Sequence, residues 1–219
     1  MLTKTKQNKR LFDKFGAITE RHKMASLLGE SPIGVPFDEI LSPTRALYKG
    51  REIVLVGTNN YLGLTFNENV RQSMIKSVET FGSATTGSRQ ANGTYGEHAK
   101  MEEELRTFFD MPSAIVFTTG YQTNLGAISA LASGDDHILI DADSHACIYD
   151  ACRLTDAATH RFRHNDPDNL DKRLKRLPET GARLVVVEGM YSMFGDVAPL
   201  SELVEVALAN DAMIFVDEA

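Results

Sequence analysis

The 219-residue sequence has few cysteines and no long apolar run, and each shortage excludes a class of protein. Its two cysteines, Cys147 and Cys152, are too few for a disulfide framework, so a reducing, cytoplasmic compartment is expected. No apolar stretch approaches the ~18 residues of a membrane span, and the longest runs, Leu184–Val187 and Ala212–Val216, are strand-like. The basic first ten residues have no apolar segment behind them, so no secretory signal is expected.

Positive charge is also in short supply. The 23 Lys and Arg residues against 30 Asp and Glu residues leave a net charge of −7, which argues against a nucleic acid or an anionic membrane as partner. The common site signatures GxxxxGK[ST], GxGxxG, HExxH, paired CxxC and GxSxG are all missing. The sequence therefore predicts no P-loop, no metal site and no hydrolase nucleophile, and it disfavours a Rossmann-type dinucleotide enzyme.

What is present is an alternation of amphipathic helices and apolar strands, with 42% hydrophobic residues to form a core. The later strands are uniformly apolar, which is typical of a parallel sheet with helices on both faces. The predicted fold class is therefore α/β, a mainly parallel sheet with right-handed crossovers. Helices are expected over residues 67–81, 96–109, 122–131, 145–154, 167–177 and 200–208. Strands are expected over residues 53–56, 114–117, 137–141, 160–162, 184–188 and 213–217.

The first 45 residues read differently from the rest. Residues 11–28 are polar with scattered apolar side chains, and this pattern predicts a helical arm. A stretch with glycine and proline, residues 29–43, then leads into the body of the protein. The predicted organisation is an arm and linker over residues 1–45 and a ligand-binding domain over residues 46–219.

Polar or flexible residues stand at the ends of four successive strands. Gly120 and Tyr121 begin a helix whose backbone N–H groups can face an anion. His145 is placed to stack on a ring or to pass protons, and Ser192 offers a hydroxyl. Asp217 ends an apolar strand, where a carboxylate is costly unless a cation pairs with it.

Each of these residues alone also fits an ordinary turn, cap or surface position. Taken together and in chain order, they match the needs of pyridoxal phosphate: a phosphate clamp, a ring cover, a partner for the phenolic oxygen and a partner for the ring nitrogen. The other histidines, His164 among them, are predicted to be structural.

Six short motifs resemble the α-oxoamine synthases, which are pyridoxal-phosphate acyltransferases of fold type I. The motifs are TNNYLGL (58–64), TGSR (86–89), TGY (119–121), DSHA (143–146), YSM (191–193) and VDEA (216–219). The resemblance implies a decarboxylative condensation of an amino acid with an acyl-CoA, and a homodimer in the complete protein.

Within the family, residues 141–150, 161–165 and 170–174 look most like the bacterial members that condense L-serine with palmitoyl-CoA in the first step of sphingolipid synthesis. Asn59 departs from this pattern, since palmitoyl-transferring members usually have Tyr there. The Asn-Asn-Tyr sequence is more like the members that form 2-amino-3-ketobutyrate. The members that form 8-amino-7-oxononanoate are a further alternative.

The resemblance also implies roles for the residues at the strand ends. Gly120 and Tyr121 would hold the cofactor phosphate, and Ser192 would bond the phenolic oxygen. His145 would stack on the pyridine ring and contact substrate. Asp217 would keep the pyridine nitrogen protonated, so that the ring acts as an electron sink.

Asn59 and Asn60 would lie near the substrate carboxylate or the site of a dimer partner. Family members continue past the DEA sequence to a Schiff-base lysine, and no lysine here stands at a matching position. Lys172 and Lys175 are expected on the exposed side of a helix. We therefore expect residues 46–219 to be the N-terminal portion of the cofactor domain, without turnover on its own. A non-catalytic partner or regulatory subunit is the alternative from another class.

Overall fold

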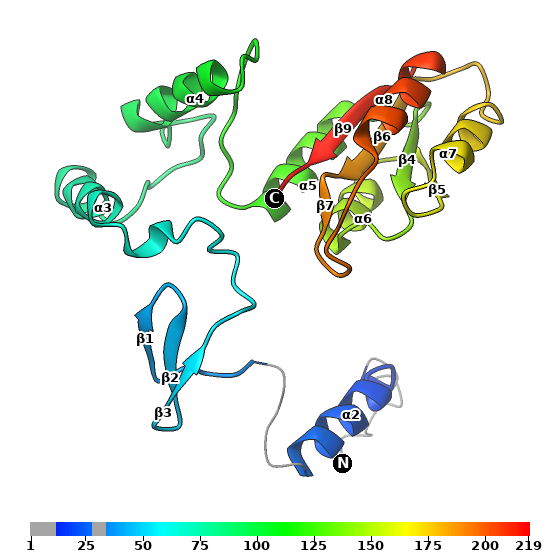
Figure 1. Cartoon of the computed structure of the whole chain (residues 1–219). Helices are drawn as coiled ribbons and strands as arrows, with labels where there is room; N and C mark the ends of the chain where they lie inside the picture. The colour runs from blue at the N-terminus through cyan, green and yellow to red at the C-terminus, as the bar shows by residue number, and fades with distance from the viewer. Residues whose placement is uncertain (1–11, 28–33) are drawn as a thin grey trace, which may run out of the picture. The chain divides into compact units, whose positions relative to one another are not determined.

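The computed structural model describes residues 12–27 and 34–219 and divides the chain into two compact units, Met1–Gly93 and Thr94–Ala219 (Figure 1). No helix in this described part is both long and apolar enough to cross a bilayer. The domain division at residues 45 and 46 stays a prediction.

The first unit contains a helix of the N-terminal arm and a small antiparallel sheet of order β1-β2-β3. The two-residue turn between β2 and β3, Lys49-Gly50, has φ angles of 50° and 73°, as the primed turns of tight hairpins require. The side chain of Asn67 caps the last helix by accepting from the amides of Asn69 and Val70. The elements are α2 (Gly16–Leu27), β1 (Glu39–Ser42), β2 (Arg45–Tyr48), β3 (Arg51–Val54), η1 (Leu64–Phe66) and α3 (Glu68–Phe81).

The predicted helix of the arm is confirmed from Gly16 to Leu27, while residues 1–11 and 28–33 of the predicted arm and linker lie outside the described residues. The prediction for the segment that follows was wrong. Strands β1 and β2 occupy part of the expected linker, and β3 ends at Val54 rather than Val56. Each of these strands has four residues, and β1 and β3 are largely exposed, so their pairing leaves no apolar pattern in the sequence.

The second unit contains a four-stranded, fully parallel sheet of order β5-β4-β6-β9, which confirms the α/β class (Figure 1). Its strands are β4 (His137–Asp141), β5 (Ala158–Phe162), β6 (Arg183–Glu188) and β9 (Met213–Asp217), with a small hairpin formed by β7 (Met190–Tyr191) and β8 (Asp196–Val197). Its helices are α4 (Gly96–Phe108), α5 (Gly120–Leu131), α6 (Ala146–Arg153), α7 (Pro167–Leu174) and α8 (Leu200–Ala209). Each expected helix from residue 67 onward is confirmed, with ends shifted by a few residues.

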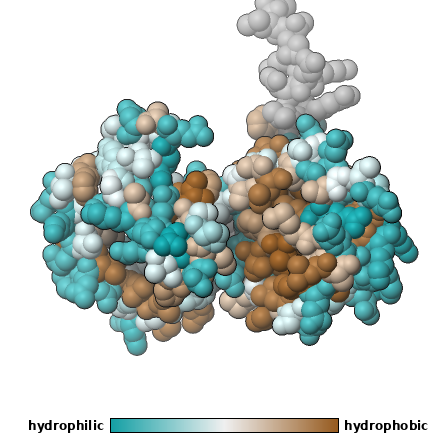
Figure 2. Space-filling view, turned by 90° about the horizontal axis from the view of Figure 1, so that it is seen from above, coloured by the Kyte–Doolittle hydropathy of each residue, from teal (hydrophilic) through white to brown (hydrophobic). Residues whose placement is uncertain are grey.

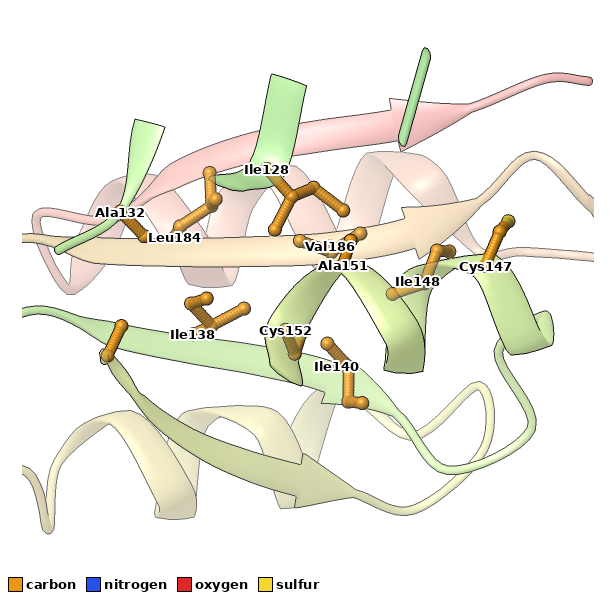
Figure 3. Close-up of a cluster of buried hydrophobic side chains, with 11 residues drawn as sticks. Ile128, Ala132, Ile138, Ile140, Cys147, Ile148, Ala151, Cys152, Leu184 and Val186 are labelled. Carbon is orange, nitrogen blue, oxygen red and sulfur yellow. The ribbon is translucent and has the colours of Figure 1, made fainter. Parts of the chain in front are cut away.

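Two buried clusters explain why the central strands are apolar throughout. Alternate residues of β4 face opposite sides, so Ile138 and Ile140 belong to one cluster and Leu139 to the other. Helices α5 and α6 cover the first cluster, to which β6 contributes Leu184 and Val186 (Figure 3). Helices α7 and α8 supply side chains to the second cluster.

The strand expected over residues 114–117 does not form in the described structure. The segment pairs with no strand of the described residues, and the backbone N–H of Val116 donates to Glu102 Oε1 at 2.9 Å. Ile115 in the same segment is 70% exposed. A strand needs a partner as well as apolar residues, and pairing is a long-range property that composition does not record.

Apolar side chains also lie at the surface, as the brown areas of Figure 2 show. Helix α3 is one source of them, because an entire stripe of the helix is exposed. The stripe consists of Val70, Met74, Ile75, Val78 and Phe81. The helical spacing predicts this face from Val70, Met74, Val78 and Phe81, but no residue of α3 is buried within the described chain.

Candidate active site

The first turn of α5 lies close to the Ala219 side chain and is built to face an anion. The Thr119 side chain caps the helix by accepting from the amide of Gln122 at 3.1 Å. The amides of Gly120 and Tyr121 donate no hydrogen bond within residues 12–27 and 34–219. A Cβ atom on Gly120 would lie 2.8 Å from the Cβ of Ala219, so a side chain there would displace Ala219, two residues after β9.

A pocket of about 210 Å³ opens beside this helix start, between α5 and the end of β9. Asp217 lies in its lining, at the carboxyl end of a parallel strand, which is where open α/β sheets bind ligands. The lining residues are Gly120, Thr123, Asn124, Phe215, Val216, Asp217, Glu218 and Ala219.

Asp217 is held in place by hydrogen bonds on both oxygens. Asn124, only 2% exposed, donates from Nδ2 to Asp217 Oδ2 at 2.7 Å, and the amide of Ala219 donates to Oδ1 at 2.9 Å. Within the described ranges, no lysine, arginine or histidine forms an ion pair with Asp217. The carboxylate is therefore oriented and still available to a cationic partner, as a protonated ring nitrogen would be.

The same asparagine connects Asp217 to His145 through Cys147. Asn124 Nδ2 also donates to Cys147 Sγ at 3.1 Å, and this sulfur lies 2.8 Å from His145 Nδ1. His145 caps α6, because Nδ1 accepts from the amide of Cys147 at 3.2 Å. A nitrogen that accepts this bond carries no proton, so the neutral ring is protonated at Nε2.

His145 is also fixed through its backbone and lies near an aromatic ring. Its amide donates to the carboxylate of Glu188, which ends β6. The Tyr121 and His145 rings lie edge to face with centroids 6.4 Å apart. The Tyr121 hydroxyl donates to Asp150 on α6, so Tyr121 connects the start of α5 to α6.

Burial and neighbouring carboxylates perturb the groups behind the pocket. Burial raises the pKa of Glu188, and the charge of Asp217 adds to the effect against the opposing hydrogen bond from His145. Burial likewise raises the pKa of the Cys147 thiol, with Asp217 and Glu188 contributing, while the hydrogen bond from Asn124 lowers it. The Cys147 thiol is therefore protonated at neutral pH, so it donates to His145 rather than acting as a nucleophile.

We expect Cys147 and Cys152 to be nearly inert toward a thiol reagent in the folded chain. Both thiols are buried, and burial raises the pKa of each. Labelling with a chromogenic disulfide at mildly alkaline pH should be at least ~10²-fold slower than in concentrated guanidinium chloride, because it requires local opening. Two thiols that react rapidly in the native chain would contradict this packing.

The structure brings together some of the residues singled out from the sequence and leaves others apart. Gly120 and Asp217 line one pocket, and Tyr121 lies against His145. Ser192 is exposed in the turn between β7 and β8 and is not in the lining. Its expected contact with a cofactor therefore stays a prediction.

Asn59 and Asn60 belong to the first unit, where Asn59 is exposed and Asn60 donates from Nδ2 to Thr65 Oγ1 at 2.8 Å. Their roles also stay predictions. Lys172 and Lys175 are exposed as expected, and Lys175 pairs with Asp171 at 2.7 Å.

Sequence reasoning missed three residues that hold the site together: Asn124, Cys147 and Glu188. Two of them leave a signal in the sequence. Asn124 is a polar residue four positions after Gly120, on the helix face that later buries Ile128. Glu188 ends an apolar strand just as Asp217 does.

Comparison with known proteins gives consistent matches. The Aminotransferase class I and II family matches residues 51–219. A serine palmitoyltransferase of Caulobacter vibrioides is 50% identical over 210 residues, 95% of this chain and 52% of that protein. An 8-amino-7-oxononanoate synthase of Symbiobacterium thermophilum is 37% identical, over 84% of this chain and 48% of that protein.

A solved structure of a serine palmitoyltransferase from S. paucimobilis, with a bound PLP–myriocin aldimine, superposes with a TM-score of 0.92 at 46% identity. The likeness covers 95% of this chain and 53% of that one, and it confirms the expected fold class. The chain spans about half the length of the curated relatives it matches.

Proposed function

Because the chain belongs to the aminotransferase class I and II family, we propose that it supplies the pyridoxal-phosphate-binding part of an enzyme that condenses L-serine with palmitoyl-CoA. The reaction would release carbon dioxide and give an α-amino ketone, the first step of sphingolipid synthesis. The relatives named serine palmitoyltransferase favour this substrate pair, since the 8-amino-7-oxononanoate synthase is a more distant match at 37% identity.

The observation that carries the proposal is the arrangement of Asp217 and the start of α5 around one pocket. Asp217, an oriented carboxylate that no cation of the described residues pairs with, lines the pocket together with Gly120. Gly120 stands at the start of a helix whose first two amides donate no hydrogen bond to this described part of the chain and can bind an anion. Pyridoxal phosphate has both complementary groups, an anionic phosphate and a basic ring nitrogen. When bound, it supplies an electron sink for the carbanion formed at the amino acid Cα.

Each of the predicted site residues would have a defined task. The amides of Gly120 and Tyr121 bind the phosphate, and Asp217 holds a proton at the ring nitrogen. Asn124 keeps the Asp217 carboxylate facing the pocket through its 2.7 Å hydrogen bond. His145 covers the ring and offers its Nε2–H to the substrate, because Nδ1 is already occupied as an acceptor. Ser192 would contact the phenolic oxygen, and Asn59 and Asn60 would lie near the substrate carboxylate or the site of a dimer partner.

A chimaera tests the proposal. In it, this chain replaces the matching 210 residues of the Caulobacter vibrioides relative. We expect the chimaera to bind pyridoxal phosphate and to release CoA from palmitoyl-CoA only when L-serine is present, with the intact relative as control. A chimaera that binds the cofactor but turns over only the substrates of an 8-amino-7-oxononanoate synthase or of a 2-amino-3-ketobutyrate ligase would overturn the substrate assignment. A folded chimaera that binds no cofactor would overturn the proposal as a whole.

Partner and compartment belong to the same proposal. We propose that the complete protein is a homodimer, which is supported by the exposed apolar stripe of α3. Light scattering on the chimaera measures the mass of the assembly.

We also propose a cytoplasmic location, since Cys147 and Cys152 are both free thiols and no disulfide is needed to hold the fold.

A further inference from the structure

His164 lies between two carboxylates that belong to different elements. Its Nδ1 is 2.9 Å from Asp141 Oδ1 at the end of β4, and its Nε2 is 2.9 Å from Asp196 Oδ2 at the start of β8. A carboxylate only accepts, and a neutral imidazole donates from one nitrogen, whereas an imidazolium donates from both. This double contact is therefore complete only when the ring carries two protons.

One further carboxylate and two aromatic rings surround His164. The carboxylate of Asp143, in the loop after β4, lies 3.8 Å from Nδ1. Tyr191 of β7 presents its ring edge to face at 4.5 Å, and Phe194 of the following turn lies at 5.6 Å. Burial raises the pKa of the Tyr191 hydroxyl, which is therefore neutral at physiological pH.

The balance between burial and hydrogen bonding favours protonation of His164. Burial disfavours the charged ring and is the largest single influence, but the hydrogen bonds to Asp141 and Asp196 and the negative charges of these carboxylates together outweigh it and raise the pKa of His164 above its ordinary value. The imidazolium persists above the pH at which an exposed histidine loses its proton, and it is lost as the pH rises through the pKa of His164 itself.

The hairpin that carries Asp196 is short, and its turn is closed by the amides of Phe194 and Gly195, which both donate to the carbonyl oxygen of Tyr191. Each strand contributes only two residues to the pairing of β7 with β8. The turn between them exposes Met193 (86%) and Phe194 (66%). Asn165, next to His164, adds one hydrogen bond from Nδ2 to Asp196 Oδ2 at 3.1 Å. The loop after β5 therefore connects β8 to the end of β4 through His164.

We propose that His164 is a positioning residue that, as an imidazolium, holds the β7–β8 hairpin and Ser192 at the carboxyl end of β4. The contact of Ser192 with the cofactor rests on the proposed function, whereas the bridge from Asp141 to Asp196 does not. His164 itself touches neither substrate nor cofactor in this scheme.

Hydrogen exchange of the 219-residue chain tests the bridge. Protection of the amides of residues 189–198, corrected for intrinsic rates, is followed from about pH 5.5 to about pH 9.5. We expect protection to fall roughly tenfold as His164 loses its proton, since one charge-assisted hydrogen bond is lost. His164→Gln should show the low protection at every pH, while the matched exposed control His22→Gln should follow the wild type.

A second variant keeps the proposal falsifiable if His164→Gln does not fold. Asp196→Asn removes one anionic acceptor, so the titration of the His164 ring, followed by NMR, should move to lower pH. Wild-type protection without a pH step, or an unshifted His164 titration in Asp196→Asn, would overturn the proposal. Asp141, Asp143 and His164 lie close enough together to hold a metal ion. Hairpin protection that depends on added Zn²⁺ rather than on the protonation of His164 would therefore overturn the proposal as well.

Pyridoxal phosphate binding by the same samples separates this inference from the proposed function. If the chain and the chimaera bind no cofactor but the hairpin keeps its pH step, the proposed function fails and the bridge stands. If the cofactor binds and His164→Gln leaves the hairpin as protected as in the wild type, the bridge fails alone.

Discussion

Asp217→Asn in the chimaera is expected to lower product formation by roughly 10²- to 10⁴-fold, because removing one partner of a desolvated charge pair costs about 3–5 kcal/mol. Asparagine fills the same volume and can still accept from Asn124, so the folded structure should survive. Asparagine is uncharged, however, and therefore cannot stabilise a protonated ring nitrogen as a carboxylate does. The measurement is CoA release with L-serine and palmitoyl-CoA, together with the thermal unfolding midpoint.

Asp211→Asn is the matched control for this experiment. Asp211 is exposed before the opposite end of β9, and its φ of 52° suits asparagine. The control should keep wild-type activity. Asp217→Glu should recover little, because the longer side chain misplaces the carboxylate. If Asp217→Asn were as active as Asp211→Asn, the ring nitrogen would have another partner.

Asp141→Ala is expected to lower the free energy of unfolding of the chain by about 3–5 kcal/mol. The side chain is fully buried and accepts from the amides of Asp143 and Asn165, each at 2.9 Å, as well as from His164. Its removal leaves these donors without an acceptor and removes a counter-charge of His164. Such a loss is a large part of the ~5–15 kcal/mol that stabilises an ordinary domain. Urea unfolding followed by circular dichroism measures it.

Asp143→Ala provides the comparison, since this carboxylate is more exposed and lies 3.8 Å from His164. Exposed ion pairs contribute about 0–1 kcal/mol, so its urea midpoint should lie close to that of the wild type. Equal losses from the two variants would show that the carboxylate of Asp141 does not organise this edge of the sheet.

The parallel sheet could be predicted because its two central strands are buried on both faces, which leaves β4 and β6 apolar along their length. The expected strand over residues 114–117 has the same apolar character but lacks a partner, and β1 and β2 pair without an apolar pattern. Strand pairing is decided between segments distant in sequence, so composition alone does not give it.

Gly120 and Asp217 could be predicted from their places at a helix start and a strand end, because the chain direction in a parallel sheet brings such positions to one edge. Asn124 could not be assigned a role in this way, since its partners Cys147 and Asp217 are 23 and 93 residues away. The role of His164 could not be predicted either, because its two carboxylate partners, Asp141 and Asp196, belong to β4 and β8. Hydrogen-bond networks between elements depend on packing geometry that no local pattern encodes.

The position of the cofactor ring relative to Asp217 is the central claim, and a crystal structure of the chimaera with pyridoxal phosphate measures it directly. We predict the ring nitrogen within about 2.7–2.9 Å of an Asp217 carboxylate oxygen, the range of a charge-assisted hydrogen bond, with the phosphate at the amides of Gly120 and Tyr121. A ring nitrogen that faces solvent or another side chain, with Asp217 still bonded only to Asn124 and Ala219, would contradict the account.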